Sequence, residues 1–349
     1  MRLEPIAAPS LGRRLGVAGV ALVTVLAVAA GLAALAGADP LSVFGLIVKG
    51  AAGSQFALTE TLKRATPLIF TGLAVAVAFR ARLWNIGAEA QLYAGAIITV
   101  VLGTGALGLP GPLLIPLIAL AAVLAGALVL LGPALLKTRF GVDEVVTTLL
   151  LNFIMLLFVS MLLEGALKDP MALGWPQSRA LVPEARLPRT LFGLRLHWGF
   201  AIALLAAVLV AVIERRTTLG FAMRAVGLNQ EAARFAGIRV NAVLIRTAIL
   251  SGGLAGLAGW SEVAGLKGSL TLDLSPGFGY TGIIVAMLAG LNPLGVVPAA
   301  IFVAGIFVGA DSMSRAAGVP SYIADILLAT ALLATLAAIR LSRYRLVRS

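Results

Sequence analysis

The stretch from Glu214 to Arg246, ERRTTLGFAMRAVGLNQEAARFAGIRVNAVLIR, is a long polar interruption between two apolar segments. Its only acidic residues are Glu214 and Glu231. Its basic residues are Arg215, Arg216, Arg224, Arg234, Arg239 and Arg246. Because the flanking segments are apolar enough for a lipid bilayer, we expect a basic, mostly helical loop that stands in the cytoplasm. Such a loop faces either a partner or the lipid headgroups.

The composition of the whole chain is that of a membrane protein. Of its 349 residues, 60% are hydrophobic and 12% are charged, with a mean hydropathy of +1.04, whereas about a quarter of residues are charged in soluble proteins. The net charge of +12 comes from basic residues in short breaks between apolar runs, which is typical of membrane orientation rather than nucleic-acid binding. The chain has no cysteine, so no disulfide or thiolate metal site is predicted.

The apolar runs predict an all-α polytopic membrane protein, because about 20 apolar residues cross the hydrocarbon layer. We predict about ten transmembrane helices in two halves of five, within one transmembrane domain over residues 1–349. The predicted spans are 15–36, 65–79, 84–103, 112–132, 145–163, 198–213, 247–264, 280–290, 298–311 and 320–339. Six spans therefore lie in 15–213 and four in 247–339, on either side of the cytoplasmic loop 214–246, and a basic tail covers 340–349.

Charge distribution predicts the orientation of these spans. If the N-terminus is inside, the basic loop 214–246 and the basic tail both lie inside with most of the 27 basic residues, as the positive-inside rule requires. Both termini are therefore predicted to be cytoplasmic. The segment from Glu164 to His197 must then be external, and its four prolines favour an irregular cap over a continuous helix.

Two motifs resemble ATP-binding sequences but lack the features that ATP binding requires. The run GPALLKT, Gly132 to Thr138, lacks the glycine before Lys137 that a phosphate-binding loop needs. The run LSGG, Leu250 to Gly253, lies inside an apolar segment, where Ser251, Ala255 and Gly259 instead form a row of small residues suited to close helix packing. This chain is predicted to bind no ATP and to be no enzyme.

Polar residues within predicted spans are candidates for a solute pathway. Asn85 and Glu89 are four residues apart, which predicts one helical face, and Tyr93 extends that face by a turn. Asn152 is similarly placed in the fifth span, and Tyr280 lies in a segment interrupted by glycine and proline. These five residues either contact a polar solute or lock adjacent helices together, and the sequence leaves both readings open.

Acidic residues within predicted spans are candidates for a function, because charges are costly there. Our candidates are Glu89, Glu262 and Asp325, of which the last two are expected to be near a membrane surface. The single histidine, His197, borders Trp198 and is expected to anchor a helix at the interface rather than to bind a metal.

The centre of the basic loop predicts a short helix. In GLNQEAARFAG, Gly227 to Gly237, Asn229 is suited to cap the start of a helix and Gly237 to end it. Ala232 and Ala233 favour helix between them. A capped helix with arginines at its margins is suited to docking into a cleft on a partner, and the alternative is an arginine-rich loop on anionic lipid.

The spacing of Glu231, Ala232, Ala233 and Gly237 is similar to that of the EAA loop by which ABC importer permeases contact their ATPases. Four longer stretches extend the resemblance over roughly residues 60 to 340. They are LWNIGAEAQLYAGA (83–96), GVDEVVTTLLLNFI (141–154), AGWSEVAGLKG (258–268) and GFGYTGIIVAMLAGLNPLG (277–295). Together they resemble the permease family serving branched-chain amino acids, ribose and nucleosides, most closely its nucleoside branch.

The resemblance implies a ten-helix permease of an ATP-driven importer in the inner membrane of a bacterium. It implies a cytoplasmic ABC ATPase that holds ATP and magnesium, a second permease of the same family, and an external solute-binding protein, with no cofactor in this chain. The implied ATPase contact comprises Arg224, Gly227, Asn229, Glu231, Ala232, Ala233, Arg234 and Gly237.

Three other functions stay open at this point. The first is an ABC permease for a sugar or a branched-chain amino acid. The second is a secondary transporter that is coupled to protons through Glu89, Glu262 or Asp325. The third is a membrane scaffold without a pathway.

Overall fold

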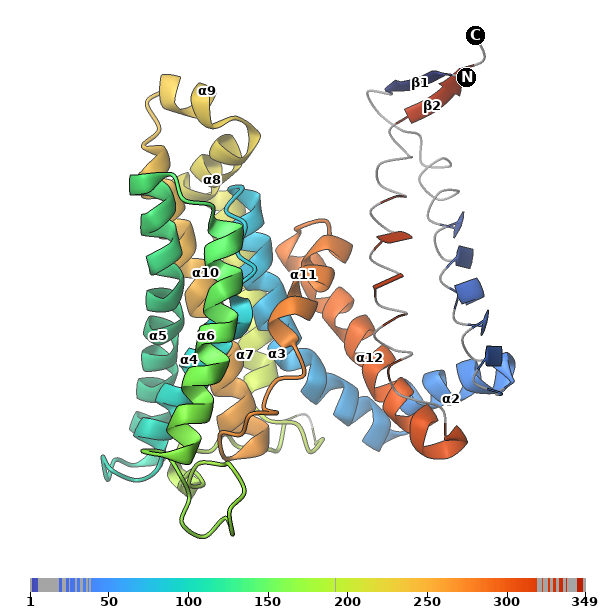
Figure 1. Ribbon diagram of the computed structural model, residues 1–349, viewed down its shortest axis with the longest axis vertical. Coiled ribbons are helices and arrows are strands. Elements are labelled where there is room, and N and C mark those ends of the chain that lie inside the picture. The colour runs from blue at the N-terminus through green and yellow to red at the C-terminus, as the bar shows by residue number, and fades with distance from the viewer. Residues whose placement is uncertain are drawn as a thin grey trace. The chain divides into compact units, whose positions relative to one another are not determined.

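The computed structural model describes residues 39–318 apart from Phe192, two terminal strands, and scattered residues within 19–37 and 322–337. The chain divides into two compact units, one of residues 1–61 with 302–349 and one of residues 62–301. We call the second, larger one the main unit. Figure 1 shows that helices dominate the described residues.

The helices follow one another along the chain with short connections, except between α6 and α7. They are α2 Pro40–Ala52, α3 Gln55–Arg80, α4 Ala88–Gly103, α5 Gly111–Phe140, α6 Glu144–Glu164, η1 Pro183–Ala185, α7 Gly199–Arg216, α8 Thr218–Leu228, α9 Gln230–Phe235, α10 Val240–Glu262, η2 Val263–Lys267, α11 Phe278–Leu288 and α12 Pro293–Ala317. Helix η2 is a π-helical continuation of α10.

Among the described residues, five helices are long and apolar enough to cross a membrane: α3, α5, α6, α12 and α10 together with η2. The predicted spans between 65 and 311 each coincide with a helix, but several limits were wrong. Helix α3 begins at Gln55, and α5 continues to Phe140. The predicted spans 15–36 and 320–339 lie largely outside the described residues, as does Asp325.

The sequence reasoning missed one helix and a pair of short strands. Helix α2 is too short to have been counted as a span, and it is capped by Asp39, whose carboxylate accepts a hydrogen bond from the Ser42 amide at 2.8 Å. The described residues are mostly helical, as predicted, but strands β1 Arg2–Pro5 and β2 Tyr344–Val347 pair antiparallel. Four-residue strands are too short to leave a readable alternation.

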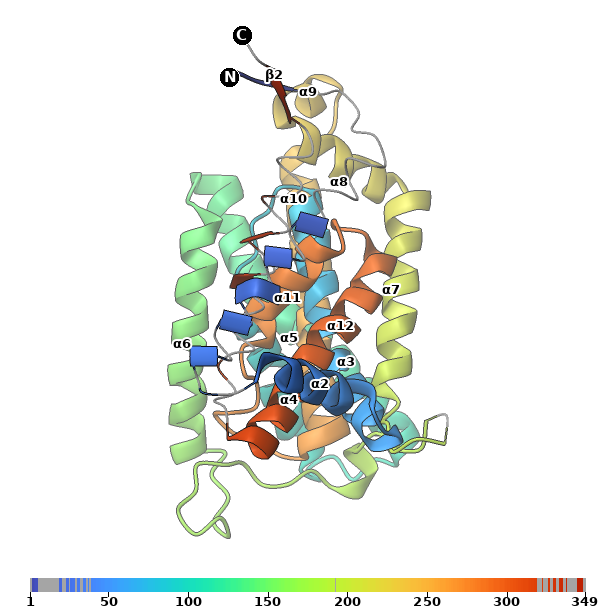
Figure 2. The same ribbon diagram turned by 90° about the vertical axis from the view of Figure 1, so that its right-hand side faces the viewer.

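The core of the main unit forms where α10 packs against α4 and α5. Small residues allow the backbones to touch: a Cβ added to Gly256 would lie 2.1 Å from the Ala122 carbonyl oxygen, and one added to Gly259 would lie 1.9 Å from that of Leu92. The predicted close packing of the small-residue row is thereby confirmed. Figure 2 shows α6 and α7 on opposite sides of the main unit, with α10 between them.

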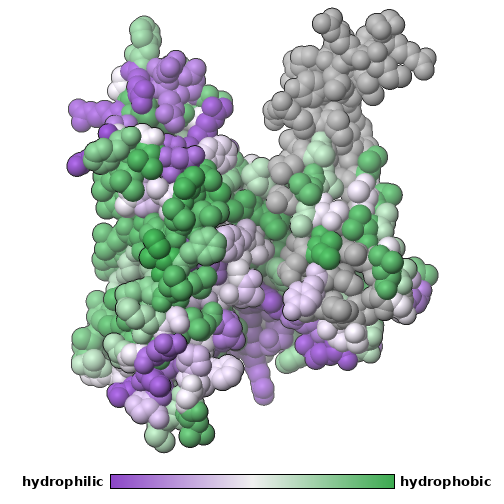
Figure 3. All heavy atoms as spheres, in the orientation of Figure 1, coloured by the Kyte–Doolittle hydropathy of each residue, from purple (hydrophilic) through white to green (hydrophobic). Residues whose placement is uncertain are grey.

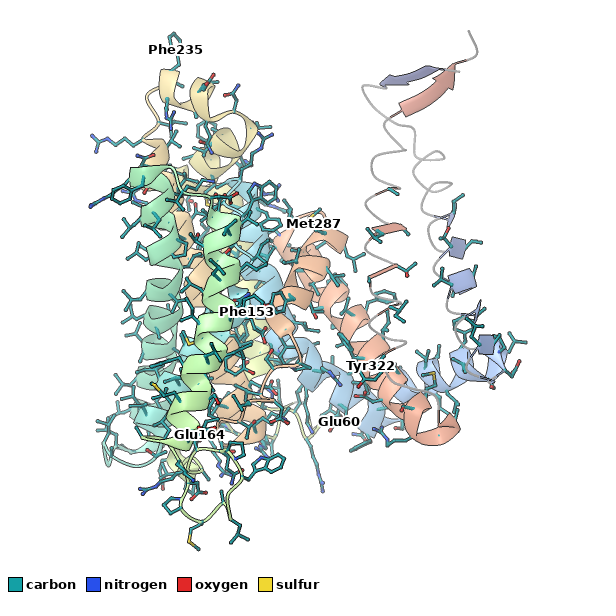
Figure 4. The ribbon with its side chains drawn as sticks, in the orientation of Figure 1. Glu60, Phe153, Glu164, Phe235, Met287 and Tyr322 are labelled. Atoms are coloured by element: carbon teal, nitrogen blue, oxygen red, sulfur yellow. The ribbon has the colours of Figure 1, made fainter. Side chains whose placement is uncertain are left out.

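The outer faces of α5 and α6 are apolar. Leu128 on α5 and Phe153 and Leu157 on α6 are exposed, and Figure 4 shows Phe153 projecting from the middle of α6. In Figure 3, hydrophobic side chains cover the middle of these helices, whereas hydrophilic side chains gather toward the two ends of the main unit. This distribution is that of a helical surface that faces hydrocarbon.

Candidate functional site

The chain is not helical between η2 and α11, and this break is held by side chains from neighbouring helices. The Tyr93 hydroxyl donates a hydrogen bond to the Leu272 carbonyl at 2.7 Å, and the Thr71 hydroxyl donates to the Phe278 carbonyl at 3.0 Å. The Phe278 amide donates to the Ser275 hydroxyl oxygen at 2.9 Å. Irregular backbone within a membrane persists only where protein or a cavity satisfies it, and here α3 and α4 do so.

Glu89 joins α4 to the start of α11. Its carboxylate accepts a hydrogen bond from the Gly279 amide at 2.6 Å, in the first turn of α11. The two backbones are in contact, since a Cβ on Gly279 would lie 2.2 Å from the Glu89 nitrogen. A carboxylate at a helix N-terminus satisfies an otherwise unpaired amide and complements the helix dipole. Glu89 is thus engaged within the protein.

Asn152 on α6 connects the same region to Tyr280. Its side-chain amide donates to the Ile86 carbonyl at 2.9 Å and to the Tyr280 hydroxyl oxygen at 3.0 Å. Its carbonyl oxygen accepts from the Ala90 amide at 2.9 Å. Asn152 is fully buried, whereas Tyr280 retains 38% of its surface. Tyr280 therefore presents a ring and a hydroxyl proton that no protein group described here accepts.

Asn85 belongs to a second buried network. Its side chain exchanges hydrogen bonds with Gln91 at 2.8 and 2.9 Å and donates to the Ser251 hydroxyl oxygen at 3.0 Å. Ser251 in turn donates to the Ala74 carbonyl at 2.7 Å. Asn85 precedes α4, so the prediction that it shares a helical face with Glu89 was wrong. The network links α3, α4 and α10.

The five predicted pathway residues therefore come together, but in unequal roles. Asn85, Glu89, Tyr93 and Asn152 are buried and hydrogen-bonded to protein groups, and Tyr280 alone among them is exposed. Sequence reasoning missed Gln91 and Ser275 and assigned Ser251 to packing alone. The available signal for Gln91 was a side-chain amide inside a predicted apolar span, two residues after Glu89, because a buried amide needs hydrogen-bond partners.

Replacing Glu89 by alanine is expected to destabilise the protein by about 1–3 kcal/mol, because the buried Gly279 amide loses its acceptor. Glu89→Gln keeps an acceptor oxygen and is expected to cost less. Thermal unfolding of the detergent-purified protein measures both. Equal melting temperatures for wild type and Glu89→Ala would show that the carboxylate does not hold α11.

His197 lies at the end of the main unit opposite α9, and the interface-anchor prediction for it was wrong. Only 2% of its surface is exposed, and a Cβ added to Gly265 would lie 2.5 Å from its Nδ1. Neither ring nitrogen has a hydrogen-bond partner among the described residues. Glu262, predicted near the surface, is likewise buried. No group of three metal-ligating side chains occurs in the part of the chain that the structure describes.

The burial of His197 predicts acid sensitivity. Burial, together with the positive charges of Arg189 and Lys63, lowers the pKa of its imidazole to about 4, against about 6.5 in an unfolded chain. At a pH between these two pKa values, His197 is protonated in the unfolded chain but not in the folded chain. The free energy of unfolding therefore falls as the pH falls, by up to about 3 kcal/mol. Melting temperatures at pH 7 and pH 5 are expected to differ more for wild type than for His197→Asn; equal differences would contradict this.

The opposite end of the main unit carries α8 and α9 (Figure 1). The Asn229 side chain accepts hydrogen bonds from the amides of Glu231 and Ala232 at 2.9 and 3.1 Å, and Gly237 has a φ of +81° just beyond the helix. The predicted capped helix is confirmed as α9. Ala233 is its buried residue, whereas Phe235 is 97% exposed and projects outward in Figure 4.

The other residues predicted for the ATPase contact fall into two groups. Glu231, Ala232, Arg234 and Gly237 are exposed on α9 and its end, which leaves them available to a partner. Arg224 and Gly227 lie on α8 and face other helices, since Arg224 donates a hydrogen bond to the Glu214 carbonyl of α7 and a Cβ added to Gly227 would lie 2.0 Å from the Arg80 carbonyl oxygen of α3.

Long apolar helices, a broken segment lined by polar side chains, and an exposed capped helix at one end define a class of membrane-transport permease. Residues 57–336 match the family described as the branched-chain amino acid transport system permease component. The chain belongs to this family.

Three curated relatives cover most of this chain. A glucose ABC transporter permease of Haloferax volcanii is 37% identical, covering 94% of this chain and 89% of its own length. A guanosine ABC transporter permease of Bacillus subtilis is 37% identical, covering 89% and 92%. A nucleoside ABC transporter permease of Lactococcus lactis is 31% identical, covering 84% and 82%.

Proposed function

We propose that this chain is the membrane-spanning subunit of an ATP-driven importer for nucleosides. Two of the three relatives described above are permeases for guanosine or nucleosides, and the sequence resembles the nucleoside branch. A sugar is the second candidate, because an equally identical relative is a glucose permease. The proposed location is the inner membrane of a bacterium.

The exposed α9 is the observation that carries this proposal. Its N-terminal turn is capped by Asn229, and Ala233 anchors it from beneath. Phe235 and the exposed Ala232 and Arg234 then form a small face with an aromatic centre and a positive margin. Exposed aromatic and arginine side chains are frequent anchors of protein interfaces. The proposed partner is a cytoplasmic ABC ATPase, which holds the ATP and magnesium.

The proposed solute contact is Tyr280. Its ring is partly exposed and its hydroxyl is oriented by Asn152. An aromatic ring stacks on a nucleobase, and a positioned hydroxyl bonds a polar edge. Glu89 and Tyr93 support it by holding α11 and its preceding loop, and Asn85 holds α4 against Ser251 of α10. The complex is completed by a second permease of the same family and an external binding protein.

A proton-coupled secondary transporter remains the rival from another class. Its candidate carriers are Glu89, Glu262 and Asp325, of which Asp325 lies outside the described residues. The contact of Glu89 argues against this role, because its carboxylate already accepts a hydrogen bond from the Gly279 amide and joins α4 to α11. A carrier that releases its proton on each cycle would have to break that contact.

Uptake into vesicles separates the two mechanisms. Right-side-out vesicles with the complete importer are loaded with ATP and given radiolabelled guanosine, with unlabelled glucose as competitor. The proposal predicts uptake that requires internal ATP, survives a protonophore and resists glucose. Uptake that needs no ATP and stops with the protonophore would contradict it, and competition by glucose would reassign the substrate to a sugar.

A further inference from the structure

The last residue of α3, Arg80, contacts two other elements with one guanidinium group. Its Nη2 lies 3.3 Å from Oε2 of Glu214, in the last turn of α7. The same nitrogen donates a hydrogen bond to the carbonyl of Leu291, in the turn between α11 and α12. Three helix ends that are distant in sequence therefore meet at one side chain.

Helix α8 rests directly on this meeting point. A Cβ added to Gly227 would lie 2.0 Å from the Arg80 carbonyl oxygen, and one added to Gly220 would lie 2.3 Å from that of Ile213. Backbone therefore touches backbone, with no side chain between α8 and the ends of α3 and α7. Arg224 adds its hydrogen bond to the Glu214 carbonyl. A displacement of α8 would therefore press directly on the backbones that carry Arg80 and Glu214.

The charges at this point are incompletely satisfied. The Glu214 side chain is almost wholly buried, yet its Oε1 has no hydrogen-bond partner among the described residues, and neither does Nε of Arg80. A buried ion pair of this kind contributes little net stability, because desolvation offsets the attraction. Arg80 and Glu214 thus each keep a polar atom that could form a hydrogen bond if the same helices adopted a second arrangement.

Helix α11 extends from this point to the candidate pathway. Leu291, with a φ of +59°, closes the turn just after α11. The first turn of α11 holds Gly279, bonded to Glu89, and Tyr280, bonded to Asn152. Eleven residues of helix span about 16 Å. Because a helix is stiff along its axis, a shift at the Leu291 end moves Tyr280 at the other end.

We propose that Arg80 is the positioning residue that transmits movement of α8 and α9 to α11 and hence to Tyr280. This inference rests on the proposed function, because it takes α9 as the ATPase contact. Arg80 does not touch the solute. Its guanidinium holds the ends of α7 and α11 in register with α8, so that ATP-driven movement of α8 reorients the pathway.

The matched control is the ion pair of Lys137 and Glu144, on α5 and α6. It lies at the same end of the main unit, and its side chains are similarly buried. Its carboxylate also accepts from the Trp84 amide, but no contact described here joins it to α8 or α11. Lys137→Gln therefore removes an equivalent charge pair outside the proposed route.

The test measures guanosine taken up per ATP hydrolysed, in proteoliposomes that hold the complete importer. Arg80→Gln is expected to lower this ratio about tenfold while the ATPase still co-purifies, whereas Lys137→Gln stays within twofold of wild type. A wild-type ratio in an assembled Arg80→Gln complex overturns the inference. If the wild type itself shows no ATP-dependent uptake, the proposed function fails instead.

A second measurement needs no partner. The chain has no cysteine, so Phe235→Cys on α9 and Met287→Cys on α11 place unique spin labels on the two helices that Arg80 is proposed to couple. In the full chain in nanodiscs, Arg80→Gln is expected to broaden the distance distribution between the labels, and Lys137→Gln is expected to leave it unchanged. An unchanged distribution in Arg80→Gln overturns the inference even if that variant does not assemble with the ATPase.

Discussion

Replacing Gly259 by valine is expected to abolish accumulation of the folded protein in the membrane. The added Cβ would lie 1.9 Å from the Leu92 carbonyl oxygen and 2.8 Å from the Ala96 nitrogen, both in the backbone of α4. Helix backbone cannot move out of the way by a change of rotamer, as a flexible side chain can. Helices α10 and α4 would therefore have to separate by about 1 Å along their contact. Overpacking of this kind costs about 1–3 kcal/mol or more, and the separation would also pull Asn85 from its partner Ser251 on α10.

Gly132→Val is the matched control for Gly259→Val. Gly132 lies on α5, and a Cβ there would meet no atom within 4 Å. Membrane fractions and size-exclusion profiles of the detergent-solubilised protein measure both variants. Gly132→Val is expected to match wild type. A monodisperse Gly259→Val protein with wild-type yield would contradict the backbone contact between α4 and α10.

Replacing Ala232 by tryptophan is expected to reduce co-purification of the ATPase at least tenfold. Ala232 is exposed in the first turn of α9, and its amide donates to Asn229 through the backbone alone. The substitution therefore leaves the fold of α9 intact and adds bulk to the face that is proposed to dock. Loss of a hot-spot contact at the centre of an interface costs about 2 kcal/mol or more, and about 1.4 kcal/mol corresponds to a factor of ten.

The control for Ala232→Trp is Leu173→Trp, in the loop between α6 and α7. Leu173 is fully exposed, and Figure 1 shows this loop at the end of the main unit away from α9. The same added bulk there is expected to leave ATPase co-purification unchanged. Retention of the ATPase by Ala232→Trp would remove α9 from the interface.

Patterns of local origin were readable in the sequence. Asn229 and Gly237 marked the ends of α9 because capping and left-handed termination depend on residue type alone. The small-residue row of α10 predicted close packing for a similar reason. Apolar runs located the helices between residues 65 and 311, although polar extensions such as Gln55 to Arg64 hid the true start of α3.

Tertiary contacts were not readable. The Gly279 amide that bonds Glu89 lies far along the chain, so the sequence alone left Glu89 open between solute contact and helix lock. His197 looked like an interface anchor because Trp198 follows it, yet glycines at 199 and 265 create the space that buries its ring. Arg80 and Glu214 gave no local signal of pairing, since each only ends an apolar helix.

The proposed docking of α9 on an ATPase is tested most directly by cross-linking. The cysteine-free chain receives Phe235→Cys or, as control, Leu173→Cys, and the assembled complex is treated with a thiol-to-amine reagent. The adduct chain is identified by photolabelling with azido-ATP. We expect Phe235→Cys to capture the ATP-labelled chain and Leu173→Cys to capture none. Capture from position 173 alone, or from neither position in a complex that hydrolyses ATP, would contradict the assignment of α9 as the ATPase contact.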